Sequence, residues 1–177
     1  ILPFEPICEL HAALESSAGG DRAWTVAPQL ALVATPGIAQ INVHEESSIS
    51  SFLPLERMPY ADAPPTEIAP SRQESVRVVR LDEIYDELVP PSATTLLKLD
   101  VQGFEDQVLA GAAKSLEKIT AILIEVSLVP LYTGQKSYLD ILGLLRARGF
   151  HAVYFSSVHS RRRHGEETRR PCAHRGM

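Results

Sequence analysis

The sequence has few of the features that mark disulfide-rich, metal-binding or membrane-spanning proteins. Its 177 residues include only two cysteines, Cys8 and Cys172, and their wide separation implies no disulfide framework. The six histidines show none of the spacings of a zinc site, so we expect no metal. No apolar run is long enough to cross a bilayer, and no basic segment precedes Glu5 and Glu9 as in a signal peptide. We therefore expect a cytoplasmic protein without integral membrane association.

Charge is unevenly distributed along the chain, whose net charge is −5. Residues 156–177 contain six arginines and two glutamates, a net +4, so residues 1–155 carry −9. An acidic body argues against nucleic-acid binding as the main role. The tail has no apolar periodicity, and we expect it to be disordered. Binding of RNA or anionic lipid through its arginines is the alternative to a solvated end.

Proline is concentrated between residues 54 and 75, a stretch with five of the chain's 13 prolines. Because proline interrupts helices and strands, we predict a long loop there. The length and apolar content of residues 1–155 suit one folded domain around this loop.

Apolar periodicity predicts strands and helices on both sides of the proline-rich loop, and their alternation is typical of an α/β protein with a mostly parallel sheet. Asp82 and Ser137 are expected to cap the starts of helices. The predicted strands are Ala23–Ala34, Gly37–His44, Val76–Arg80, Thr95–Leu99, Ala121–Val126 and Phe150–Phe155. The predicted helices are 6–18, 82–88, 104–118 and 137–148.

The stretch from Leu96 to Val126 contains the first candidate site. A short apolar strand ends there beside three charged residues, Lys98, Asp100 and Glu105. In open α/β sheets, ligands bind at the carboxyl ends of strands. The alternatives are a structural ion pair between Asp100 and Lys98, which share a face of the strand, and a Glu105 that merely sits well at a helix start.

Glu5 is a second candidate, because it joins a strand-like segment to a helix. In nucleotide-binding units an acidic residue beyond a strand accepts hydrogen bonds from ribose hydroxyls. The alternative is that the helix dipole alone favours a carboxylate at this position.

The motif LKLDVQGFE at residues 97–105 is followed by VLAGA at 108–112 and IEV at 124–126. This succession resembles the FkbM family of S-adenosylmethionine-dependent methyltransferases, and the resemblance covers residues 4–155. Weaker matches in the same order are Phe4-Glu5-Pro6, Ala31-Leu32, Gly37, the serine-rich loop with Ser48 and Ser51, Leu131-Tyr132 and Gly149-Phe150.

The resemblance implies a Rossmann-like class I methyltransferase sheet with helices on both faces, and S-adenosylmethionine as the cofactor. It also implies O-methylation of a small-molecule or glycan acceptor, such as a hydroxyl of a sugar, glycolipid or polyketide-like compound. A homo-oligomer is compatible with the sequence, and nucleic acid is not expected as a partner.

The resemblance also implies roles for individual residues. By position, Glu5 would bind the cofactor ribose. Asp100 would lie beside both the cofactor methyl group and the acceptor, and a carboxylate there can serve as a general base. Lys98 and Glu105 would orient Asp100 or the acceptor. The matched segments offer Ser48, Glu125 and Tyr132 as candidate substrate-binding residues.

Two features of that family are missing from this sequence. Its first strand and glycine-rich loop should precede Phe4, where only three residues stand, and further sheet should follow Phe155. We therefore expect a truncated methyltransferase domain that lacks its first strand and has impaired activity. The alternative is a non-catalytic remnant or a binding module.

Overall fold

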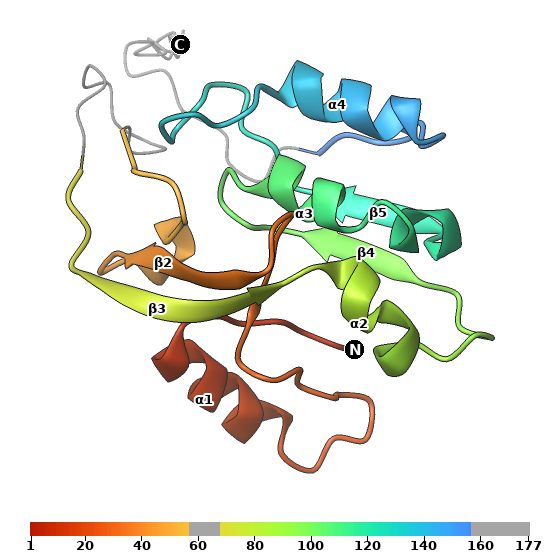
Figure 1. Cartoon of the computed structure of the whole chain (residues 1–177), viewed down its shortest axis with the longest axis horizontal. Helices are drawn as coiled ribbons and strands as arrows, with labels where there is room; N and C mark the ends of the chain where they lie inside the picture. Colours follow the sequence, from red (N-terminus) through yellow and green to blue (C-terminus); the bar gives the residue numbers. More distant parts are fainter. Residues whose placement is uncertain (57–67, 157–177) are drawn as a thin grey trace, which may run out of the picture.

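The strands of the protein form two small sheets, with helices packed against them (Figure 1). The structure, a computed structural model, describes residues 1–56 and 68–156. The predicted tail lies outside these ranges except for Ser156, as does the middle of the predicted proline-rich loop. In chain order the elements are α1 (Cys8–Ala18), β1 (Ala31–Leu32), β2 (Gly37–Val43), η1 (Ser47–Ile49), β3 (Arg72–Val79), α2 (Leu81–Leu88), β4 (Leu96–Leu99), α3 (Glu105–Gly111), η2 (Ser115–Lys118), β5 (Ala121–Ile124) and α4 (Tyr138–Ala147).

The first sheet has the strand order β1-β3-β2. Strand β3 runs parallel to β1 and antiparallel to β2, with Gly37 opposite Val78 and Val43 opposite Arg72. Ile41 and Val43 of β2, and Val76 and Val78 of β3, alternate along their strands and are buried, which places them on the covered face of the sheet. A core cluster joins these strands to the start of α1 through Ile7.

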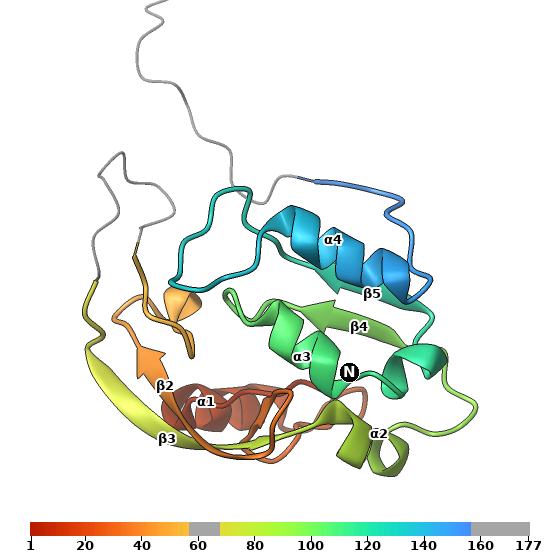
Figure 2. The ribbon, with the colours of Figure 1, turned by 45° about the horizontal axis from the view of Figure 1, so that its top comes forward.

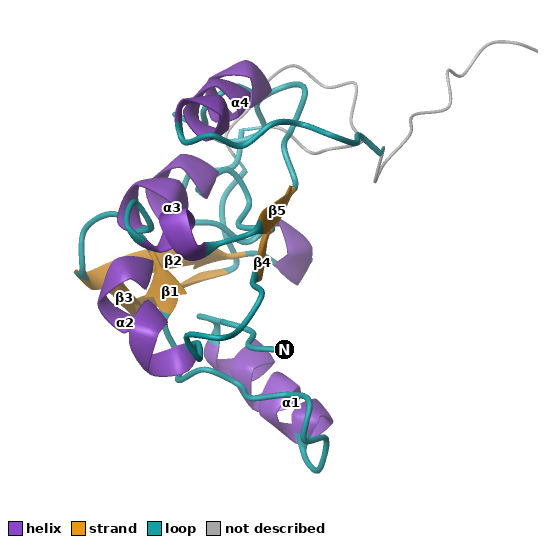
Figure 3. Ribbon diagram, turned by 90° about the vertical axis from the view of Figure 1, so that its right-hand side faces the viewer, coloured by secondary structure: helices purple, strands orange, loops and turns teal. Residues whose placement is uncertain are grey.

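The second sheet consists of β4 and β5, which run parallel with Leu96 opposite Ala121 and Leu99 opposite Ile124. One face of the pair packs against a core made by α2, α3 and α4, and Figure 3 shows α3 and α4 on the same side of both strands. The predicted mixed α/β class is confirmed. The described strands form two separate sheets, however, and not one continuous sheet.

The predicted strand Ala23–Ala34 is correct only at its end, because β1 is limited to Ala31–Leu32. Pro28 interrupts it and has no amide hydrogen to donate. The residues before Pro28 instead hydrogen-bond to the start of the chain: Thr25 N donates to Ile1 O at 2.9 Å, and Ala27 N donates to Pro3 O at 3.1 Å.

The predicted helix over residues 104–118 is broken into α3 and η2. Asp82 contributes to this break: its carboxylate accepts hydrogen bonds at 2.7–3.1 Å from the amides of Lys114 and Ser115 and from the Ser115 hydroxyl. It therefore caps η2 rather than its own helix, which begins after Arg80. By contrast, Ser137 caps α4 as predicted, by accepting a hydrogen bond from the Asp140 amide at 3.2 Å.

Two further predictions of strand and loop boundaries were wrong. Strand β3 begins at Arg72, so the proline-rich loop ends before residue 75. Phe150–Phe155 is not a strand, and Val153 in its middle is 96% exposed. No neighbouring strand among the described residues supplies the backbone partners that this apolar segment would need.

Gly111 allows α3 to approach β1 closely, and this contact can be tested. A Cβ atom at Gly111 would lie only 2.0 Å from the Val33 carbonyl oxygen, whereas one at Gly143 in α4 would meet nothing within 4 Å. We expect Gly111→Ala to lower the free energy of unfolding by about 1–3 kcal/mol through overpacking. The control Gly143→Ala should raise it by up to about 1 kcal/mol, because alanine favours helix. Urea denaturation measures both, and a Gly111→Ala protein as stable as the wild type would contradict the close approach.

Candidate functional site

A tight turn after β4 positions the candidate site. Gln102 has a φ of 52° and Gly103 a φ of 89°, so two successive residues adopt the left-handed region. This conformation costs a non-glycine residue energy and persists only where its surroundings fix it. Here the Gly103 amide donates to the Glu105 carboxylate at 3.1 Å. A Cβ atom at Gly103 would lie 3.0 Å from the Tyr132 ring, so this position also favours glycine sterically.

Asp100 lies at the carboxyl end of β4 and has a hydrogen-bond donor on each oxygen. Lys98 Nζ lies 2.9 Å from Oδ2, and Gln102 Nε2 donates to Oδ1 at 2.8 Å. The side chain of Asp100 is 34% exposed. Since each carboxylate oxygen has two lone pairs, both oxygens can still accept a hydrogen bond from an external hydroxyl.

Tyr132 extends this hydrogen-bonded group from the opposite side of Gln102. Its hydroxyl lies 3.2 Å from the side-chain carbonyl of Gln102 and 3.1 Å from the backbone carbonyl of Ile49. Burial raises the pKa of Tyr132, and the negative charges of Glu105, Glu125 and Asp100 raise it further. The phenol therefore keeps its proton and acts as a hydrogen-bond donor at neutral pH.

Ser51 ties the same turn to the first sheet. Its hydroxyl donates to the Gln102 backbone carbonyl at 2.7 Å, and its backbone exchanges two hydrogen bonds with Asn42 of β2. Ser48, the serine predicted from the sequence, instead donates to exposed Glu46 at 3.1 Å. The structure thus brings Ser51 to the Asp100 group and leaves Ser48 outside it.

Glu105 is almost fully buried, with 4% of its surface exposed. Burial raises its pKa, although hydrogen bonds from the backbone amides of Glu105, Gly103 and Val101 oppose the shift. Its carboxylate therefore faces the backbone of the turn and shapes it. Asp100, five residues earlier, faces solvent instead.

Glu5 lies outside the Asp100 group, at the start of α1. Its Oε1 accepts a hydrogen bond from the Ile7 amide at 2.8 Å, and neighbouring Glu74 accepts one from the Cys8 amide at 3.2 Å. Burial raises the pKa of Glu5, while the Ile7 hydrogen bond and His11 lower it. Within residues 1–56 and 68–156, no hydrogen bond or ion pair joins Glu5 to Asp100.

The site residues predicted from the sequence thus fall into two groups. Four lie together around the turn, and the charge of Glu125 acts on one of them, Tyr132. Ser48 and Glu5 lie elsewhere. Sequence reasoning missed Gln102 and Ser51, whose only signals were their positions inside matched segments. The residues that lie together are Lys98, Asp100, Glu105 and Tyr132.

The part of the chain that the structure describes contains no group of three or more His, Cys, Asp or Glu residues arranged to hold a metal ion. None of its helices combines the length and apolar character needed to span a membrane.

Comparison with known proteins gave one match. The family model described as the methyltransferase FkbM domain matches residues 1–152, which include Glu5, the turn after β4 and Tyr132. No curated protein and no solved structure showed a significant match to the chain.

The buried carboxylate of Glu105 leads to a prediction about stability and pH. The pKa of Glu105 in the folded state is raised above the ordinary 4.5. The free energy of unfolding of the wild type therefore falls as the pH rises from about 4.5 toward the raised pKa. Glu105→Gln lacks this titration, so its stability relative to the wild type should improve between about pH 4 and pH 7. Urea denaturation at both pH values measures the difference.

A second variant separates charge from hydrogen bonding at Glu105. Glu105→Ala also lacks the titration but leaves the buried Gly103 amide without its acceptor, which should cost about 1–3 kcal/mol at every pH. A stability difference between Glu105→Gln and the wild type that does not change with pH would contradict the raised pKa.

Proposed function

The chain belongs to the FkbM methyltransferase family, and from this premise we propose that it transfers a methyl group from S-adenosylmethionine to an acceptor hydroxyl. The acceptor class is a sugar, glycolipid or polyketide-like compound. Within the site, the proposal is carried by the position of Asp100 at the end of β4. Its carboxylate is partly exposed, and Lys98 and Gln102 each contact one of its oxygens.

The proposed fold is the Rossmann-like arrangement of this class of enzyme. Its support is the parallel pairing of β4 with β5 and the course of the first residues, which run toward α1 in the same direction as β4 (Figure 1). Parallel segments present their carboxyl ends at one edge, where ligands bind in α/β sheets. Glu5 and Asp100 each follow such a segment.

Glu5 fits the role of a ribose ligand by its hydrogen bonding. One oxygen, Oε1, is engaged by the Ile7 amide. The other, Oε2, accepts no hydrogen bond from residues 1–56 or 68–156, and the side chain is half-buried. A carboxylate held at one oxygen and open at the other suits a diol such as that of ribose.

S-adenosylmethionine, when bound, supplies an electrophilic methyl group on a sulfonium. The task of the protein is to hold the acceptor oxygen in line and to manage its proton, and such alignment can lower a barrier by several kcal/mol. In our proposal the acceptor hydroxyl hydrogen-bonds to an Asp100 oxygen, which takes the proton as the oxygen is methylated.

The neighbours of Asp100 act as positioning residues in this proposal. Lys98 and Gln102 hold the two carboxylate oxygens, and Tyr132 holds Gln102 through its side-chain carbonyl. Glu105 acts one step further away, by fixing the backbone turn that carries Gln102.

Asp100→Asn tests the proposal, because the amide keeps the size of the side chain but cannot take a proton. With methyl-labelled S-adenosylmethionine and a panel of hydroxylated acceptors, we expect methyl transfer to fall about 100-fold or more. Asp106→Asn is the matched control, since the Asp106 side chain on α3 accepts its one hydrogen bond among the described residues from the Gln107 side chain, at 2.9 Å. It should keep wild-type activity.

Calorimetric titration with S-adenosylmethionine separates binding from catalysis. The wild type and both variants should bind the cofactor. Full methyl transfer by Asp100→Asn would reject the role of Asp100, and a wild type that binds no cofactor would reject the methyltransferase proposal for this chain.

A further inference from the structure

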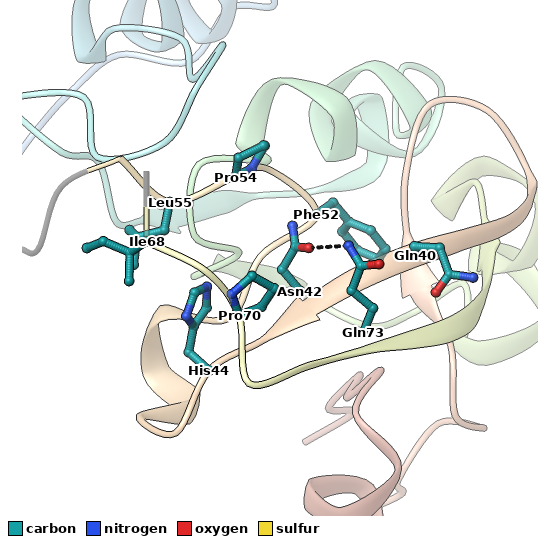
Figure 4. Close-up of a pocket in the computed structure, with 9 residues that line it drawn as sticks. All are labelled: Gln40, Asn42, His44, Phe52, Pro54, Leu55, Ile68, Pro70 and Gln73. Carbon is teal, nitrogen blue, oxygen red and sulfur yellow. Dashed lines mark hydrogen bonds between the residues drawn. The ribbon is translucent and has the colours of Figure 1, made fainter. Parts of the chain in front are cut away.

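A pocket of about 340 Å³ lies beside β2 and β3, on the first sheet rather than at Asp100 (Figure 4). Part of its wall is the segment that follows η1. The residues that line it are Gln40, Asn42, His44, Phe52, Pro54, Leu55, Ile68, Pro70 and Gln73.

The chemistry of the lining selects against charged ligands. His44 is the only one of the nine described lining residues whose side chain could carry a charge near neutral pH. Burial lowers the pKa of His44, so its imidazole is neutral at pH 7. An anion would therefore meet no positive partner in this wall, and a cation no negative one.

Three side-chain amides, those of Gln40, Asn42 and Gln73, supply hydrogen-bonding capacity in the pocket lining. Gln73 donates to the Asn42 side-chain carbonyl at 2.8 Å, as Figure 4 shows, and Gln40 donates to the Ser75 hydroxyl at 2.6 Å. These contacts hold the amides in place. The carbonyls of Gln40 and Gln73 accept no hydrogen bond from the described residues and are available to hydroxyl donors.

His44 supplies the second observation that points to a ligand. It is only 6% exposed, and its Nε2 is buried with no hydrogen-bond partner among the described residues. Such unpaired buried polar atoms are rare in native proteins and cost free energy.

Apart from the three amides and His44, the lining is apolar. Phe52 contributes an aromatic ring, which lies against the Phe104 ring with 5.1 Å between centroids, and Pro54 and Pro70 contribute saturated rings. A ligand that matches both kinds of lining residue carries several hydroxyls and also presents an apolar face. A pyranose ring has this combination.

The pocket and the Asp100 group share a wall. Ser51 bridges Asn42 to the Gln102 carbonyl, and Leu55 forms a backbone bridge with Tyr132. Phe52, Pro54 and Leu55 thus line the pocket, while Ser51 of the same segment supports the turn after β4.

We propose that this pocket binds an uncharged, hydroxyl-bearing ring of the pyranose type and, in the proposed reaction, holds the body of the methyl acceptor. Only the second part of this inference, that the bound ring belongs to the methyl acceptor, rests on the proposed function. Binding of the ring is a property of the pocket and can be measured without methyl transfer.

Nuclear magnetic resonance of the ¹⁵N-labelled chain tests the inference. The probes are methyl β-glucopyranoside, methyl β-galactopyranoside and, as an anionic ring of the same size, glucose 6-phosphate. We expect saturable shifts of the side-chain amide signals of Gln40, Asn42 and Gln73 with at least one neutral glycoside, and much weaker ones with the phosphate.

Gln73 is exposed and Phe52 is partly buried, and a leucine at either position should leave the protein folded. Gln73→Leu removes an open carbonyl and Phe52→Leu removes the ring, and each should weaken glycoside binding on the order of tenfold, the value of about one hydrogen bond or aromatic contact. Gln29→Leu is the control, because Gln29 is an exposed amide outside the pocket that donates to the Pro6 carbonyl at 2.9 Å. It should leave the affinity unchanged.

Each outcome decides the matter. Absence of saturable shifts at the pocket amides with both glycosides overturns the inference, and so does binding of glucose 6-phosphate alone. Calorimetry with S-adenosylmethionine on the same sample keeps the two proposals apart. Cofactor binding without glycoside binding rejects the pocket and leaves the methyltransferase, whereas the reverse result rejects the methyltransferase and leaves the pocket.

Discussion

The hydrogen bond from the Gly103 amide to the buried carboxylate of Glu105 is the constraint on which the site depends. A buried carboxylate is costly unless hydrogen bonds compensate it, and here the backbone of the turn supplies them. In return the carboxylate stabilises a turn in which Gln102 adopts a φ of 52°. That conformation directs the Gln102 side chain toward Asp100 and its backbone carbonyl toward Ser51.

The same turn connects the two sheets. Gln102 follows β4, whereas Ser51 is bridged to β2, so their 2.7 Å hydrogen bond spans the junction between the sheets. Figure 2 shows η1 and the end of β2 beside the loop that leads into α3. Polar networks of this kind are worth more than the sum of their pairs when every member is satisfied. A change at Glu105 should therefore also affect Ser51, to which it is linked through the turn.

Local signals predicted the fold well where the structure is locally determined. The strand Leu96–Leu99 and the Ser137 cap of α4 are examples, because both depend on residues a few positions apart. The break between α3 and η2 was not predictable in this way. It depends on Asp82, more than 30 residues earlier, and on the approach of Gly111 to Val33. The apolar run Phe150–Phe155 failed as a strand for the same reason, since strand formation needs a partner that periodicity does not reveal.

The two carboxylates after β4 show what sequence can and cannot establish about the site. Spacing offered the Asp100–Lys98 pair as a structural alternative, because residues i and i+2 of a strand share a face, and the structure contains this pair at 2.9 Å. Spacing did not distinguish Asp100 from Glu105, which belong to the same motif. Burial does: Glu105 is enclosed by the backbone it shapes, while Asp100 is 34% exposed with lone pairs available. Only the exposed carboxylate can exchange a proton with an external hydroxyl. In the proposed reaction Asp100 therefore has the chemical role, and Glu105 has the structural role of fixing the turn.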